Sequence, residues 1–231
     1  MTKAGVKSYK AQTGLSLINV LVALNISILC AIASMTLYTN HQVAADDVRD
    51  LGTINQQVAL AMLVLQKEVS SAGFGIEDAD ATNAAVVNSG GGGAASGETR
   101  LLWRYMENGT TTCRGVREVQ QTIDTIDYRV LSIVESISDC DGSSALASLA
   151  WDTERGIIGQ WKISNDLASY LTTNGTLFSF QLAPASCAPF GMGAPSAHVA
   201  ATINAPSLAE INGVIGNTNT ATICLLNMTS S

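Results

Sequence analysis

The feature that most constrains this chain is an uncharged apolar run near its N-terminus. Residues 15–38 (LSLINVLVALNISILCAIASMTLY) contain 24 residues and no charged side chain. At about 1.5 Å per residue, a helix of this length spans roughly 36 Å, which exceeds a bilayer core of about 30 Å. The run therefore predicts a transmembrane helix.

The flanking charges orient that helix. Residues 1–14 carry three lysines and no acid, whereas three aspartates lie within 46–50. Because basic residues are retained on the cytoplasmic side, the N-terminus is expected in the cytoplasm. A secretory signal peptide is the alternative: AIAS at 31–34 offers a small-residue cleavage site, although the apolar region is longer than the ~7–15 residues of such peptides.

A second pattern continues the helix beyond the membrane segment. Apolar residues recur at spacings of three and four between Leu51 and Ala72, and polar residues occupy the other faces. Gly73 and Gly75 follow as a stop signal. We therefore expect one helix from about residue 15 to about 72, apolar all round in its first half and one-sided in its second. The one-sided stripe is expected to pack on a sheet. Its members are Leu51, Ile54, Val58, Met62, Leu65, Val69 and Ala72.

The remaining sequence predicts a β-rich domain. Short runs rich in β-branched and aromatic residues alternate with turn signals such as ENGT and TNG. GGGGAASG at 90–97 is expected to be a flexible loop, and the tail after residue 184 reads as mostly loop. The three tryptophans are expected in the core. The predicted strands are 99–106, 124–136, 156–164, 176–183 and 221–228.

Four cysteines lie beyond the apolar run and predict two disulfides formed in an oxidising compartment. They are Cys113, Cys140, Cys187 and Cys224, while Cys30 lies within the run. Four cysteines allow three pairings, and we favour Cys113–Cys140 with Cys187–Cys224 because this pairing closes the shortest loops. No CxxC pair occurs, and His41 and His198 have no metal-ligand spacing, so neither a metal site nor a cofactor is expected.

Composition argues against nucleic-acid binding and catalysis. The formal charge is −7, and without the first 14 residues it is 9 minus 19, or −10, which repels phosphate backbones. A local exception would be a basic patch supplied by Arg100, Arg104, Arg114 and Arg117. No GxSxG elbow or phosphate-binding loop is present, and ISDCDGSS at 137–144 lacks the closing glutamate of a calcium loop. We therefore expect a non-enzymatic protein.

The junction TG-LSLINVLVAL resembles the processing site of the type IV pilin and pseudopilin superfamily. In that family a prepilin peptidase cuts after the glycine and methylates the new terminus, which implies cleavage after Gly14 and N-methylation of Leu15. LVLQKEVSSAGFGI at 63–76 is similar to the end of the helix in PilW-type minor pilins and GspJ-type pseudopilins. The resemblance is specific over about the first 76 residues.

One position departs from the family pattern. Asn19 stands where the family has a glutamate, whose carboxylate pairs with the amino terminus of an adjoining subunit. The tip pseudopilin of secretion systems also lacks this glutamate, so Asn19 favours a tip-proximal subunit. The alternative is that the amide, or another subunit, suffices inside the filament.

The resemblance implies an α+β, pilin-like fold with a long N-terminal helix packed on an antiparallel β-sheet head. It divides the chain into a cleaved leader (1–14), a transmembrane half-helix (15–38), an amphipathic half-helix (39–75) and a periplasmic head (76–231). The expected function is assembly of a type IV pilus as a minor pilin, from the bacterial inner membrane to the cell surface. The implied partners are other minor pilins, the major pilin, prepilin peptidase and the inner-membrane assembly platform.

Two alternatives remain open. A minor pseudopilin of a type II secretion system would share every motif above. A protein of a different class, an exported binding domain or enzyme with an uncleaved signal anchor, would not depend on prepilin peptidase. The sequence does not distinguish twitching, adhesion, DNA uptake or secretion.

Overall fold

The computed structural model describes residues 17–88, 98–136, 140–151, 153–188, 195–207 and 218–230. The chain divides into two compact units, residues 1–50 and 51–231. The predicted leader and the glycine-rich segment 90–97 lie outside the described residues.

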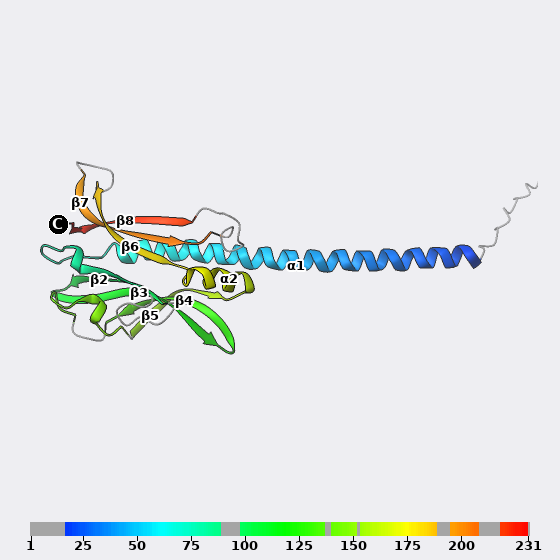
Figure 1. The fold of residues 1–231 in the computed structure, drawn as a ribbon, viewed down its shortest axis with the longest axis horizontal. Helices are drawn as coiled ribbons and strands as arrows, with labels where there is room; N and C mark the ends of the chain where they lie inside the picture. Colours follow the sequence, from blue (N-terminus) through cyan, green and yellow to red (C-terminus); the bar gives the residue numbers. More distant parts are fainter. Residues whose placement is uncertain are drawn as a thin grey trace, which may run out of the picture. The chain divides into compact units, whose positions relative to one another are not determined.

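The first unit is dominated by the N-terminal part of helix α1 (Figure 1, blue), which extends from Leu17 to Val69 and has 53 residues. Its segment Leu17–Gln42 is long and apolar enough to cross a membrane, and none of it is buried. Apolar side chains exposed on every face are unfavourable in water and favourable in lipid. This segment is therefore a membrane anchor or a signal sequence, as expected from its composition.

Three polar side chains within this segment hydrogen-bond to the backbone of the helix itself. Asn25 donates to the carbonyl oxygen of Leu21 at 3.0 Å, and Ser27 donates to that of Ala23 at 2.8 Å. Thr36 makes the same type of bond one turn back. Such local bonds reduce the cost of placing polar groups in lipid.

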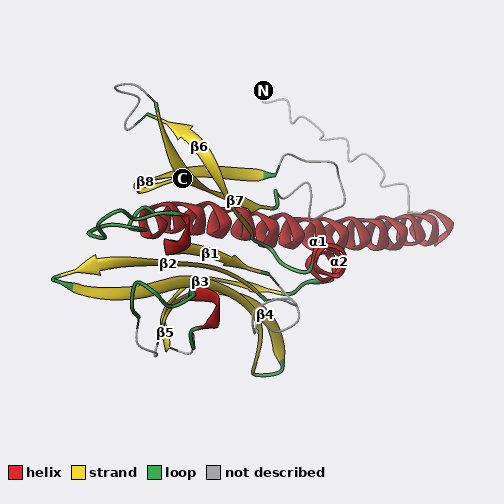
Figure 2. Cartoon of the chain, turned by 60° about the vertical axis from the view of Figure 1, so that its left-hand side comes forward, coloured by secondary structure: helices red, strands yellow, loops and turns green. Residues whose placement is uncertain are grey.

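The second unit contains the C-terminal part of α1 between two antiparallel sheets (Figure 2). The larger sheet has the strand order β1-β2-β3-β4-β5, and the smaller has the order β6-β7-β8. The α+β class with antiparallel sheets is thus confirmed. The strands are β1 (Ala84–Val87), β2 (Thr99–Glu107), β3 (Thr110–Ile123), β4 (Ile126–Glu135), β5 (Thr153–Lys162), β6 (Ser179–Cys187), β7 (Ser196–Ala205) and β8 (Asn219–Thr229).

The apolar stripe of α1 forms the shared core of both sheets. Val58, Leu65 and Val69 are each at most 1% exposed. They belong to one cluster with Trp103 and Val116 of the larger sheet and with side chains of all three strands of the smaller sheet. The predicted packing is confirmed for the members of the stripe from Ile54 to Ala72, but on two sheets where one was expected. The side chain of Leu51 lies outside the described part of the chain.

Two glycines end the helical region where the sequence predicted a stop. Gly73 and Gly75 have backbone φ angles of +74° and +72°, which residues with a side chain rarely adopt. A Cβ on Gly75 would lie 2.7 Å from the carbonyl oxygen of Met106. The turn can therefore hydrogen-bond to strand β2, with Gly73 donating to Arg104 at 2.9 Å and Met106 donating to Phe74 at 2.7 Å.

The two disulfides have the pairing favoured from the sequence. Cys113 of β3 is bonded to Cys140, and Cys187 of β6 is bonded to Cys224 of β8. The first disulfide lies beside a small second core, in which Leu102 and Val134 pack against Trp151. It thus attaches the connection between β4 and β5 to the face of the sheet that points away from α1.

Several elements differ from the sequence predictions. Strands β1, β3 and β7 and helix α2 (Asn165–Asn174) were not predicted. The tail from residue 184, predicted to be loop-rich with one strand at 221–228, contains β7 as well as β8, and β6 extends into it. The segment 124–125 is a tight turn, not the start of a strand, with φ of 48° at Asp124 and 70° at Thr125. The tryptophans at 103, 151 and 161 are buried, as expected.

A buried ion pair joins the larger sheet to the connection that leads into the smaller one. Glu118 of β3 and Arg129 of β4 are 0% and 3% exposed, and Arg129 Nε donates to Glu118 Oε1 at 2.8 Å. Glu118 also accepts from the backbone N–H groups of Leu177 and Phe178, at 2.8 and 2.7 Å. Burial raises the pKa of Glu118, and the charge of Arg129 and the two N–H groups oppose that rise.

Because every partner of Glu118 is buried, neutralising it should leave an uncompensated charge on Arg129. We expect Glu118→Gln to lower the free energy of unfolding by about 3–5 kcal/mol. Chemical denaturation of the full chain in detergent, followed by tryptophan fluorescence, measures this loss. The control is Arg155→Gln, which breaks the exposed Arg155–Glu135 pair and should cost about 1 kcal/mol or less. Equal losses in the two variants would contradict the proposed importance of the buried pair.

Candidate functional site

The predicted processing junction is only partly described by the structure. Gly14 and Leu15 lie outside the described residues. Asn19 lies in the first turn of the described part of α1 with its side chain exposed. No hydrogen bond joins its amide to another of the described residues.

The second unit also exposes a separate set of apolar side chains on α1, called the exposed stripe below. Leu60, Leu63 and Val64 are 55%, 62% and 38% exposed, although neighbouring helix positions are fully buried. Their spacing places them on one face of the helix, which neither sheet covers. This face is therefore available for contact with another apolar surface.

A charged cavity of about 370 Å³ lies where α1 meets strands β2–β5. Arg114 donates to Glu68 of α1 at 3.1 Å, and its guanidinium lies 5.3 Å from the centre of the Tyr105 ring. On the same cavity, Arg155 makes two hydrogen bonds to Glu135, at 2.8 and 2.7 Å. The cavity is thus lined by two ion pairs, Arg114–Glu68 and Arg155–Glu135, and by the further carboxylate of Glu107.

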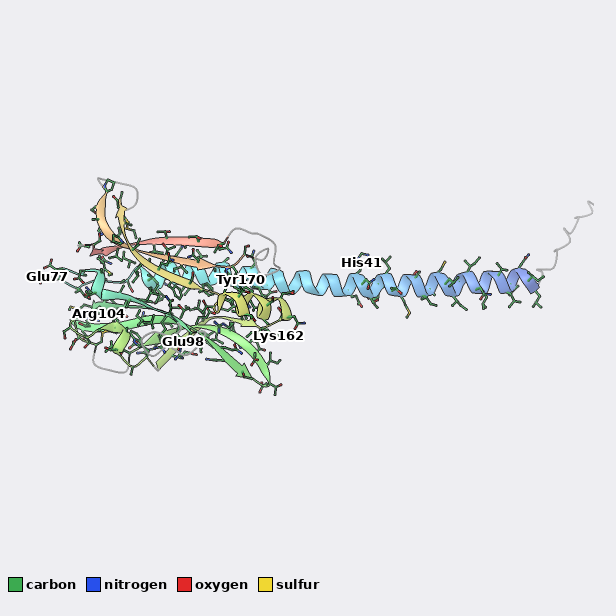
Figure 3. All side chains as sticks on the ribbon, viewed as in Figure 1. His41, Glu77, Glu98, Arg104, Lys162 and Tyr170 are labelled. Atoms are coloured by element: carbon green, nitrogen blue, oxygen red, sulfur yellow. A yellow bond between two sulfur atoms is a disulfide. The ribbon has the colours of Figure 1, made fainter. Side chains whose placement is uncertain are left out.

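A second cavity, of about 460 Å³, has a different character. It lies between α2 and one end of the smaller sheet, and none of the described residues that line it is charged. Tyr170, labelled in Figure 3, and Asn174 contribute from α2, and Asn204 contributes from β7.

A buried arginine fixes the loop that follows Cys140. Arg104 of β2 is 2% exposed and donates to the backbone carbonyls of Asp141 and Ser144. Asp141 in turn accepts from Ser143 and Ser144, through both their hydroxyl and their backbone N–H groups. Residues 137–139 are outside the described part of the chain, and the described part of this loop is a hydrogen-bonded turn.

The four arginines considered as a basic patch do not form one. Arg100 and Arg117 are cross-strand neighbours, and Glu98 lies 2.8 Å from the first and 3.9 Å from the second. Arg104 is buried, and Arg114 points to the opposite face of the sheet, where it pairs with Glu68. The patch hypothesis is therefore wrong: strand alternation separates Arg114 from the other three, and on their face one arginine is buried and two lie beside a carboxylate.

The two histidines lie in ordered elements. His41 lies on α1, and His198 lies in strand β7, not in the loop expected from the sequence. The Nε2 atom of His198 is 2.6 Å from Ser196 Oγ, and its Nδ1 atom is 3.1 Å from the carbonyl oxygen of Met228. No cavity described for this chain adjoins this pair. Among the described residues, no group of three or more His, Cys, Asp or Glu side chains could hold a metal ion.

Comparison of the chain with protein families, with curated proteins and with solved structures finds no match.

The sequence analysis missed the residues that line both cavities. The charged cavity depends on β3, and the uncharged cavity depends on α2 and β7, none of which was predicted. One available signal was Ser164, which caps α2 by accepting from the N–H of Leu167 at 3.3 Å. Together with Asp166 in the first turn and Gly175 at the end, it marks a short helix.

The Asp141 turn should give a characteristic pH dependence. Hydrogen bonds from the hydroxyls of Ser144 and Ser143, then from their N–H groups, lower the pKa of Asp141 from 3.8 to about 2. A lowered pKa stabilises the fold above the unfolded value of 3.8, and the stabilisation disappears as the pH falls towards 2. The difference in unfolding free energy between wild type and Asp141→Ala should therefore be constant above pH 3.8 and shrink to nothing near pH 2.

Acid-range denaturation curves of both proteins measure that difference. Ser148→Ala serves as the control, since Ser148 Oγ donates to Ala145 and does not contact Asp141. A wild-type–variant difference that stays constant through the whole acid range would show that the Asp141 turn does not titrate in this way.

Proposed function

We propose that this chain is a minor type IV pilin that primes or caps the pilus. Before assembly it is held in the bacterial inner membrane by its stem, the apolar segment Leu17–Gln42 of α1. Its head, residues 76–231, lies in the periplasm at that stage. The proposed partners are other minor pilins and the major pilin, through their N-terminal helices, together with prepilin peptidase and the assembly platform.

The observation that carries the proposal is the two-part character of α1. Leu17–Gln42 is apolar and exposed, whereas residues 58–72 form the core of a disulfide-bonded head. A basic leader ending in Gly14 precedes this helix. A secreted enzyme has no need for its anchor to be the core helix of its own domain, but a filament subunit needs a stem that is tied to its head.

The physical logic of assembly follows from the exposed stem. Apolar side chains withdrawn from lipid can be reburied only against other apolar surfaces. The stems of neighbouring subunits supply such a surface. The stripe formed by Leu60, Leu63 and Val64 would extend the contact into the head.

One observation supports a position at the tip. Asn19 lacks the charge of the glutamate that shaft subunits of this family use for pairing. A subunit with no neighbour beyond it has no need of that charge, which suits the end of a filament better than its shaft.

The orientation is supported by chemistry on both sides of the membrane. Lysines in residues 1–14 favour a cytoplasmic N-terminus. The two disulfides favour an oxidising compartment for the head.

Processing of the N-terminus gives the decisive test. When prepilin peptidase is present, mass spectrometry of the membrane-bound chain should find a mature form that begins at an N-methylated Leu15. Replacing Gly14 by valine should leave the full-length chain, because the enzyme cuts after the glycine. A chain that starts at Met1, or near Ser34, whether or not the peptidase is present would overturn the proposal and favour an exported, signal-anchored domain.

Incorporation into the filament should depend on the exposed stripe. Leu63→Gln is expected to change the free energy of unfolding by less than about 0.5 kcal/mol, since Leu63 is 62% exposed. If a neighbour buries this leucine at a cost of about 1.5–3 kcal/mol on truncation, incorporation should fall roughly tenfold or more. Immunoblots of sheared filaments and of the membrane fraction measure this ratio.

The matched control is Ile157→Gln, which removes an equally exposed side chain (54%) from strand β5, away from α1. Filament levels of this variant should equal those of wild type. Equal incorporation of all three proteins would show that the stripe makes no contact in the filament.

A further inference from the structure

The uncharged cavity has a regular polar edge that the assembly proposal does not explain. Ser179 of β6, Asn204 of β7 and Thr220 of β8 are aligned as register partners across the smaller sheet. Asn204 Nδ2 donates to Ser179 Oγ at 3.3 Å, and Thr220 Oγ1 donates to Asn204 Oδ1 at 2.8 Å. The three side chains therefore form one hydrogen-bonded row along the side of the cavity.

This row keeps hydrogen-bonding capacity for a ligand. An amide group has two donor hydrogens and an acceptor oxygen with two lone pairs, and a hydroxyl both donates and accepts. Asn204 uses one of its hydrogens and one of its lone pairs within the row. The row thus presents pre-aligned donors and acceptors in the same place.

The opposite side of the cavity is held in position by the buried ion pair. Arg129 donates to the carbonyl of Gly175 at 2.8 Å, and Glu118 accepts from the N–H of Leu177. Leu177 is 2% exposed and lines the cavity together with Tyr170 of α2. A connection fixed by a charged pair gives the cavity a preformed wall, which lowers the entropic cost of binding.

The chemistry of the lining selects the ligand class. A volume of about 460 Å³ is in the range of small-molecule sites. Among the described lining residues there is no carboxylate for a cation and no lysine or arginine for an anion. The described lining combines a polar row that donates and accepts with the ring of Tyr170, which lines the same cavity.

We propose that this cavity binds a neutral carbohydrate. A sugar ring has hydroxyl groups that donate and accept along its edge and an apolar C–H face, which matches the two sides of the cavity. The inference goes beyond filament assembly and does not rest on it, because the described residues that line the cavity lie on α2, on the connection to β6 and on or next to the smaller sheet, and none of them belongs to α1. The saccharide would be recognised in the same way whether it is free or attached to a surface polymer.

Saturation-transfer NMR on the full chain in a polyoxyethylene detergent tests the proposal, since maltoside detergents carry a saccharide themselves. The probes are the methyl glycosides of glucose, galactose and mannose, and N-acetylglucosamine, at up to about 10 mM, ten times a Kd of about 1 mM. Glucose 6-phosphate and glucosamine are the charged comparators, and N-acetyl-trialanine amide is the comparator for a peptide. We expect saturable binding of at least one neutral sugar and weaker binding of the charged comparators.

Asn204→Ala and Thr220→Val should each weaken that binding about threefold to tenfold, the loss that corresponds to one or two hydrogen bonds. The control is Thr172→Val, which removes an exposed hydroxyl on α2 that donates to the carbonyl of Ala168 and does not line the cavity. Thermal melting of each variant establishes that the fold is retained. Absence of binding by every neutral sugar, preference for a charged sugar or for the peptide amide, or equal binding by the cavity variants and the control would each overturn the proposal.

Because N-terminal processing is measured separately, a negative sugar result leaves the filament proposal untouched. Conversely, binding by a chain that is never processed would support the carbohydrate site while the filament proposal fails.

Discussion

The packing of α1 between the two sheets is the interaction on which the second unit depends. Ala61 and Leu65 are completely buried, and the cluster that contains them includes side chains from both sheets. Neither sheet has a core of its own on the face that points to the helix. The sequence that anchors the chain and the sequence that organises the head therefore belong to one helix. Loss of the buried stripe would therefore unfold the head and not merely detach it.

Buried charges then fix the connections that the helix does not reach. Glu118 and Arg129 hold the segment between α2 and β6, and Arg104 holds the loop after Cys140. In each case a charged side chain is bonded to backbone groups that a loop would otherwise expose to water. Such pairs contribute little net stability compared with apolar residues of the same size, but they specify one arrangement of the loop. The uncharged cavity depends on this fixed arrangement, because one of its walls is the connection held by Glu118.

The elements that the sequence predicted are those whose pattern is local. The stripe of α1 repeats at helical spacing, Gly73 and Gly75 stop the helix, and the nearest cysteines form the disulfides. Strand β3 was missed because its sequence, TTTCRGVREVQQTI, looks polar, and its charges are neutralised by residues distant in the chain such as Glu68 and Arg129. Helix α2 and strand β7 lack a distinct periodicity, since Ala, Thr and Asn dominate both. Both cavities include residues of these elements, so they could be found only once the capping signal of α2 and the tertiary partners of β3 and β7 were known.

Asn19 changes the energetics of the stem in a way that bears on its proposed place in the filament. A carboxylate at the centre of a helix in lipid costs about 2.5–3.5 kcal/mol on insertion scales, but Asn19 is the third residue of the segment Leu17–Gln42 and lies near its end. An amide at this position carries no charge, so under the proposed function the stem can stay in lipid without a cationic partner. A subunit that stays in lipid until others pack against it is suited to beginning an assembly. Leu60, Leu63 and Val64 on the exposed face of α1 would then be the first surface in the head for those neighbours to contact.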